Sequence, residues 1–213
     1  MRPVMCLITD RHRAGGERAQ VQRVAVAARA GVHLVQVRER DLDGRALLDF
    51  VRRCLDAVHA TGTRVVVNDR LDVALAAGAH GVHLRGDSLP ARRARAITPS
   101  GFVVGRSVHT REEAVAAASD GGLDYLMFGT VFPTSSKAGR TPAGAHALAD
   151  VVTATALPVL AVGGVTAETA SDAGRAGAAG FAAIGLFTIA DDEPLRHALA
   201  SAARAFDTRE SLR

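Results

Sequence analysis

The chain of 213 residues has the composition of one globular domain, since 48% of its residues are hydrophobic and 23% are charged. These fractions exclude a disordered protein, which could not bury enough apolar surface to offset the entropy of the chain. The net charge of +4 would suit nucleic acid, but the chain has no tryptophan and one tyrosine, so aromatic platforms for stacked bases are scarce. We therefore expect no nucleic-acid partner and attribute the positive charge to a small anionic substrate.

Cysteine content and hydropathy indicate a cytoplasmic protein. The two cysteines, Cys6 and Cys54, are too few for a disulfide framework, and we expect both to be buried thiols in a reducing compartment. No apolar run approaches the roughly 18 residues of a membrane span, and the first residues do not form a signal peptide. We expect no membrane partner. A homodimer is compatible with the sequence, which shows no apolar stripe that would require one.

Short β-branched segments alternate along the chain with longer segments of helical period. The predicted strands are 4–9, 32–38, 64–68, 81–84, 103–107, 125–129, 158–162 and 181–184. The predicted helices are 19–30, 44–61, 71–77, 89–97, 111–119, 143–154, 167–176 and 193–207. Eight such units without a break predict an α/β fold, a single (β/α)8 TIM barrel over residues 1–213. A doubly wound sheet is the alternative, but it would rarely need eight strands in so short a chain.

Active sites of such barrels lie at the C-terminal ends of the strands, and polar residues follow the second and third predicted strands. Side-chain alternation directs Arg38 and Arg40 to one side, toward the mouth of the barrel. Asn68 and Asp69 end the third strand, where an amide and a carboxylate can orient a polar substrate or bind a metal. A helix N-cap is the alternative role for Asp69.

The fifth and sixth strands end in further candidates. His109 lies just past the fifth strand, two residues after Ser107, and is the histidine best placed for proton transfer. The loop after the sixth strand carries Thr134, Ser136 and Lys137, the only lysine among 26 lysine and arginine residues. Hydroxyl groups and a compact ammonium can together bind an anion.

Glycines follow the seventh and eighth strands at Gly163, Gly164 and Gly185. Backbone amides of these two loops form the phosphate site common in this fold, and glycine lets the backbone approach the phosphate closely. His83 differs from these candidates because it lies within the fourth strand. We expect it to be a packed, hydrogen-bonded histidine of the core.

Five segments resemble one known superfamily in their order and spacing: VQVRER, VVVNDRLDVALAAGAHGVHL, GRSVHTREEA, DYLMFGTVFPTSSK and PVLAVGGV. The chain is similar over nearly its whole length to the thiamine phosphate synthase and thiazole tautomerase superfamily. In its synthases, Mg²⁺ assists the transfer of a pyrimidine from its diphosphate to a thiazole phosphate. The resemblance assigns diphosphate binding to Arg38, Thr134, Ser136 and Lys137, metal binding to Asp69 beside Asn68, and thiazole phosphate binding to Gly163, Gly164 and Gly185.

Two positions depart from the synthase pattern. Ser88 stands where synthases usually carry a carboxylate that is the second metal ligand, and Arg40 replaces the usual lysine. Loss of one of two carboxylates should weaken Mg²⁺ binding, because hard cations prefer anionic oxygens. Asp87 is one residue away and replaces that carboxylate only if the loop shifts. Ser88 and the segment ending at His109 resemble the tautomerase branch instead.

We therefore expect a thiazole tautomerase, an isomerase that aromatises a carboxylated thiazole phosphate by proton transfer. The resemblance makes His109 the acid and base, and the substrate carboxylate would meet Arg38 or Lys137. The tautomerase would need no cofactor. The alternative is the Mg²⁺-dependent synthase, and a second alternative is a paralogue that binds a phosphorylated ligand without turnover.

Overall fold

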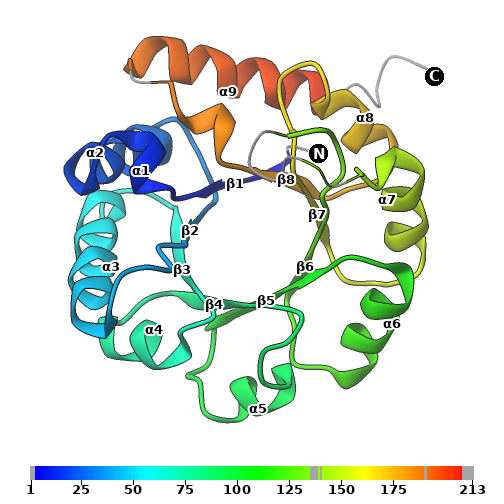
Figure 1. Ribbon diagram of the computed structural model, residues 1–213, viewed down its shortest axis with the longest axis horizontal. Helices are drawn as coiled ribbons and strands as arrows, with labels where there is room; N and C mark the ends of the chain where they lie inside the picture. Colours follow the sequence, from blue (N-terminus) through cyan, green and yellow to red (C-terminus); the bar gives the residue numbers. More distant parts are fainter. Residues whose placement is uncertain (1–2, 135–138, 140, 190, 208–213) are drawn as a thin grey trace.

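The computed structural model describes residues 3–134, 139, 141–189 and 191–207. In this part of the chain, eight parallel strands close into a barrel in sequence order and the helices surround it (Figure 1). The predicted (β/α)8 barrel is therefore confirmed. The strands are β1 (Val4–Ile8), β2 (Leu34–Val37), β3 (Arg64–Asn68), β4 (Gly81–Leu84), β5 (Val103–Val108), β6 (Tyr125–Phe128), β7 (Val159–Val162) and β8 (Gly180–Ala183).

The helices pack their apolar faces against the outside of the barrel. They are α1 (Arg11–Ala14), α2 (Glu17–Arg29), α3 (Gly44–Val58), α4 (Leu71–Ala77), α5 (Ala91–Ala96), α6 (Arg111–Asp120), α7 (Gly144–Thr153), α8 (Ala170–Arg175) and α9 (Asp192–Phe206), with a 3-10 helix, η2 (Gly185–Phe187). The sequence did not predict α1 or η2, because each is a single turn with no helical repeat of apolar residues. Among the described residues, no helix combines the length and the apolarity needed to cross a bilayer.

Local signals explain where several helices begin. Asp43 caps α3, since its carboxylate accepts a hydrogen bond from Ala46 N at 2.9 Å. Thr110 caps α6 in the same way through Glu113 N at 3.1 Å. Ser88 caps no helix, because α5 starts after Pro90.

Alternation along the strands separates two apolar layers. Side chains that point outward pack under the helices, whereas Cys6, Leu34, Val66 and Leu160 fill the barrel interior. Cys6 and Cys54 are both buried free thiols, as expected. The same alternation turns polar residues near the ends of β2 to β5 inward, which places them above the apolar interior at the mouth of the barrel.

Candidate functional site

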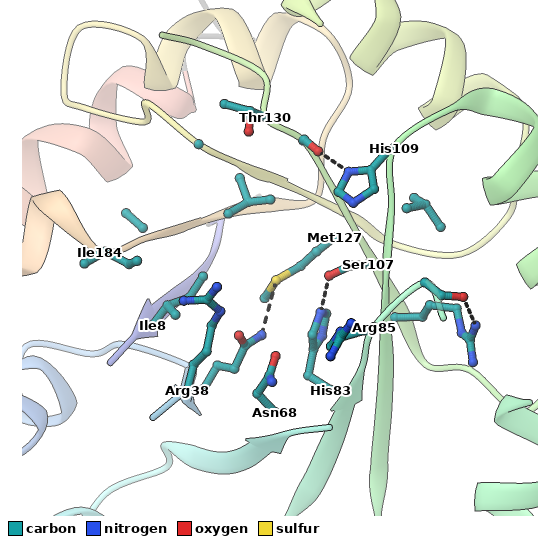
Figure 2. Close-up of a pocket in the computed structure, with 18 of the residues that line it drawn as sticks. Ile8, Arg38, Asn68, His83, Arg85, Ser107, His109, Met127, Thr130 and Ile184 are labelled. Atoms are coloured by element: carbon teal, nitrogen blue, oxygen red, sulfur yellow. Dashed lines mark hydrogen bonds between the residues drawn. The ribbon is translucent and has the colours of Figure 1, made fainter. Parts of the chain in front are cut away.

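A cavity of about 1300 Å³ opens at the C-terminal ends of the strands. Most predicted site residues that the structure describes line it: Arg38, Arg40, Asn68, Ser107, His109, Thr134, Gly163, Gly164 and Gly185. In Figure 2, Arg38, Asn68 and His83 lie on one side of this cavity and His109 and Thr130 on the other. Ser136 and Lys137 fall outside the described residues.

Asp69 does not line this cavity, which corrects the expectation that it joins the other candidates there. It faces a smaller cavity of about 190 Å³ beside Glu39 and Arg40. Its φ of 60° turns the backbone away from the strand direction. One carboxylate oxygen accepts a hydrogen bond from the Ser88 hydroxyl, and the other lies 3.5 Å from a guanidinium nitrogen of Arg85. It is not a helix cap either, since Arg70 holds that position.

The segment after β2 directs Arg38 and Arg40 toward the cavity because the residue between them, Glu39, points away from it. Glu39 is buried and accepts hydrogen bonds from the backbone N and a guanidinium nitrogen of Arg11, each at 3.1 Å. This attachment to α1 leaves Arg38 and Arg40, on either side of Glu39, at the cavity. Burial, and then the nearby Arg40 charge, lower the pKa of Arg38. An anion bound at this point would relieve both effects.

The sequence patterns did not single out three further arginines in the cavity wall, Arg13, Arg85 and Arg106. Arg106 donates to the carbonyl oxygens of Gly86 and Leu89, so it holds the loop after β4 in place. Arg85 lies between two carboxylates, with Nη2 donating to Asp87 at 2.6 Å and Nη1 near Asp69. The signal was present, because Arg85 directly follows β4, where a barrel places binding residues.

The opposite end of the cavity is formed by the glycines after β7 and β8. Gly163 and Gly164 have positive φ values of 97° and 67°. A β-carbon on Gly164 would lie 2.3 Å from Pro133 O, and one on Gly163 would lie 2.5 Å from Thr130 Cγ2. Because neither position has room for a side chain, the loop after β7 packs directly on the loop after β6. This packing leaves backbone of both loops at the cavity.

His109 is held at the cavity by two hydrogen bonds. Its Nδ1 donates to the carbonyl oxygen of Gly129 at 2.5 Å, and its backbone N donates to Glu113 at 2.7 Å. In the neutral ring, Nε2 is then the hydrogen-bond acceptor. The geometry places this acceptor on the cavity wall.

His83 is a buried core histidine, as predicted, with both ring nitrogens in hydrogen bonds. Nδ1 lies 3.0 Å from the Tyr125 hydroxyl and Nε2 lies 2.8 Å from the Ser107 hydroxyl. Burial, and then the charges of Arg106 and Arg38, lower the pKa of His83 from 6.5 to about 3. The ring is therefore neutral in the folded protein at physiological pH.

This neutral histidine should make stability depend on pH. The unfolded chain binds a proton at His83 below about pH 6.5 and the folded chain does not, so stability falls as the pH drops below that value. We expect the wild type to lose about 1.4 kcal/mol per pH unit more than a His83→Gln variant between roughly pH 6 and pH 5. Urea unfolding at both pH values measures the difference. Equal slopes for the two proteins would contradict the assignment.

Comparisons with known proteins identify the family. The family model for thiamine monophosphate synthase matches residues 5–187. The chain belongs to the thiamine monophosphate synthase family. It is 40% identical over 166 residues to a thiamine-phosphate synthase of Roseiflexus castenholzii, covering 78% of this chain and 72% of that protein. It is 36% identical over 190 residues to the thiamine-phosphate synthase of Chlorobium luteolum, covering 89% and 87%.

A solved structure supports the same family. Thiamine phosphate pyrophosphorylase from Pyrococcus furiosus superposes with a TM-score of 0.81 at 29% identity, covering 96% of this chain and 95% of that one. A 3-hexulose-6-phosphate synthase, with a TM-score of 0.69 at 17% identity, shares the fold alone. The family is one of enzymes.

These relatives overturn the expectation of a thiazole tautomerase. They carry the name of the synthase, which the sequence analysis held as its alternative. The tautomerase expectation rested on Ser88 and on the segment that ends at His109, and neither feature separates the two activities. In the structure this serine lies in a cavity wall that also carries Arg38, Arg85 and Arg106, so cationic groups are present there without the carboxylate.

Proposed function

We propose that the chain is a thiamine-phosphate synthase, a transferase that joins a pyrimidine diphosphate to a thiazole phosphate. The observation that carries this proposal is the presence of two different anion-binding regions in one cavity. Arg38, Arg40 and Arg85 supply positive charge at one side, and the glycine loops at Gly163 and Gly185 supply backbone at the other. A reaction between a diphosphate and a phosphate needs two such regions. The names of the relatives support the same activity.

The proposed reaction exchanges one bond for another. The carbon–oxygen bond to the diphosphate breaks, and the diphosphate leaves with the electron pair. A carbon–nitrogen bond forms from the thiazole nitrogen to the same carbon. Negative charge grows on the diphosphate as the bond breaks, so Arg38 and Arg40 would stabilise the transition state more than the substrate. Asn68 and Thr134 would orient the reactants, and His109 would accept a hydrogen bond rather than move a proton.

The residues present suit a divalent cation that arrives with the diphosphate. Among the described residues, no group of three His, Cys, Asp or Glu side chains could hold a metal alone. Mg²⁺, however, is commonly bound by one or two carboxylates together with substrate phosphates. Asp69 lines the smaller cavity, which shares Arg40, Asn68 and Arg85 with the main one. At the border of the two cavities, Asp69 and the neighbouring oxygens of Ser88 and Asn68 would hold the cation. When bound, the cation would neutralise charge on the departing diphosphate.

Ser88 should limit the affinity for this cation. We expect Ser88→Asp to tighten Mg²⁺ binding in the presence of inorganic pyrophosphate by about tenfold, since it adds an anionic oxygen next to Asp69. Isothermal titration calorimetry measures the affinity directly. Ser88→Asn is the matched control, with nearly the same size and no charge. An Asp variant that binds Mg²⁺ no more tightly than the Asn variant would contradict the site.

The activity itself is tested with both substrates and the purified chain, with and without Mg²⁺. The expected result is thiamine phosphate and pyrophosphate in equal amounts, detected by chromatography and a coupled pyrophosphate assay. A folded protein that binds both substrates but forms neither product would overturn the proposal and support the paralogue without turnover.

A further inference from the structure

A chain of buried polar groups crosses three neighbouring strands beneath the cavity. Tyr125 on β6 contacts His83 on β4 at 3.0 Å, and His83 contacts Ser107 on β5 at 2.8 Å. Tyr125 and His83 are buried, and His83 and Ser107 both line the cavity. Figure 2 shows the His83 ring beside the Ser107 hydroxyl. The chain therefore connects the barrel interior to the place where a ligand would bind.

Gly105 makes the contact between Tyr125 and His83 geometrically feasible. In the strand register it lies between them, pairing with His83 on one side and with Tyr125 on the other. A β-carbon on Gly105 would lie 2.1 Å from the Tyr125 ring carbon Cζ and 2.6 Å from its hydroxyl oxygen. The tyrosine ring thus occupies the space above β5 that a side chain would fill, and reaches across to β4.

The hydrogen-bond partners decide which atoms carry the protons. In the described part of the chain, the Tyr125 hydroxyl makes its hydrogen bond with His83 Nδ1, so its proton goes to that nitrogen. Nδ1 is then the acceptor of a neutral ring, and the ring proton is on Nε2. Nε2 donates to the Ser107 oxygen, which leaves the proton of that hydroxyl available to the cavity. If the ring proton were on Nδ1 instead, the buried Tyr125 hydroxyl proton would have no acceptor, which costs free energy.

We infer that Tyr125 is a positioning residue that acts through His83 to make the Ser107 hydroxyl a hydrogen-bond donor to a phosphoryl oxygen of the bound ligand. Asn68 lies next to His83 in the strand register, and Arg85 lines the same wall. This neighbourhood assigns Ser107 to the diphosphate rather than to the phosphate. That choice of ligand rests on the proposed function, whereas the proton arrangement does not.

The proton arrangement is tested by nuclear magnetic resonance of the protein labelled with ¹⁵N-histidine. Long-range ¹H–¹⁵N correlations distinguish a protonated ring nitrogen from an unprotonated one. We expect His83 in the wild type to carry its proton on Nε2. We expect Tyr125→Phe, which removes the donor to Nδ1, to yield a mixture of tautomers. A wild-type ring protonated on Nδ1, or an unchanged ring in the variant, would overturn the inference.

The effect on the ligand is tested by calorimetry with inorganic pyrophosphate and, separately, inorganic phosphate. We expect Ser107→Ala to weaken pyrophosphate binding at least tenfold and Tyr125→Phe to weaken it about fivefold. In the Ser107→Ala background, Tyr125→Phe should have no further effect, because the tyrosine acts only through the serine. Ser171→Ala, which removes a serine hydroxyl on α8 that bonds to Glu168 O, is the control and should change neither affinity.

Each outcome has a defined meaning. Independent losses in the double variant would overturn the positioning role, as would unchanged binding of both anions in Ser107→Ala. A loss confined to inorganic phosphate, or no binding of pyrophosphate by the wild type, would overturn the assignment of Ser107 to the diphosphate. A wild type that binds pyrophosphate through Ser107 yet forms no thiamine phosphate would contradict the proposed function and support this inference.

Discussion

We expect Arg38→Ala to lower kcat/KM for thiamine phosphate formation by about 100- to 1000-fold. Arg38 is half-buried at the cavity, and its backbone N donates to the Thr9 hydroxyl at 2.9 Å, which fixes the start of the segment after β2. Because burial and Arg40 already lower its pKa, its charge is poorly compensated without a ligand. A departing diphosphate supplies the missing negative charge, so the loss should fall mainly on kcat.

Steady-state kinetics with both substrates measure this loss. Arg38→Lys keeps the charge but not the planar fork, and should recover part of the activity. Arg52→Ala removes an exposed arginine from α3, outside the barrel, and serves as the control with unchanged kinetics. If Arg38→Ala and Arg52→Ala were equally active, Arg38 would have no part in the reaction.

Gly164→Ala should impair the reaction to a comparable extent, by disturbing substrate binding at the other end of the cavity. The new methyl group would collide with the carbonyl oxygens of Pro133 and Phe132, at 2.3 and 2.6 Å, and the loops after β6 and β7 would have to separate. We expect the KM for the thiazole phosphate to rise by about 100-fold, because the backbone that faces the phosphate moves with the loop. Kinetics at saturating pyrimidine diphosphate give this value.

Gly101→Ala is the matched control for backbone conformation. Gly101 also has a positive φ, 77°, but nothing lies within 4 Å of the position of its β-carbon. Gly101→Ala should lose about 1 kcal/mol of stability from the strained φ, measured by urea unfolding. Gly164→Ala should lose more, because the two loops must also separate. Only Gly164→Ala should lose substrate affinity. Equal KM values in the two variants would show that the contact between the two loops does not shape the site.

Much of the site followed from local sequence patterns. Alternation directs Arg38 and Arg40 to the cavity, and the ends of β3 and β5 place Asn68 and Ser107 in its lining. These residues meet at one cavity because a closed parallel barrel brings the C-terminal ends of all its strands to one face. A residue at the C-terminal end of a strand therefore lies on this face of the barrel.

The sequence predictions failed where a residue departs from the strand conformation, or where a loop residue can contact more than one partner. Asp69 follows β3 directly, but its positive φ and its contacts with Ser88 and Arg85 turn it toward a second cavity. The interpretation of Ser88 as evidence for a tautomerase failed for a related reason. One residue type in a loop does not reveal the arginine that the fold places beside it.

The sequence by itself determined the (β/α)8 barrel, its inward-facing residues and the glycine loops, because strand alternation, helical period and glycine are local properties of the chain. The tertiary structure alone decided which polar groups pair. Tyr125 reaches His83 over Gly105, three residues on three different strands. Such contacts depend on strand register and on the space left by an absent side chain. Neither can be predicted from the spacing of residues along one segment.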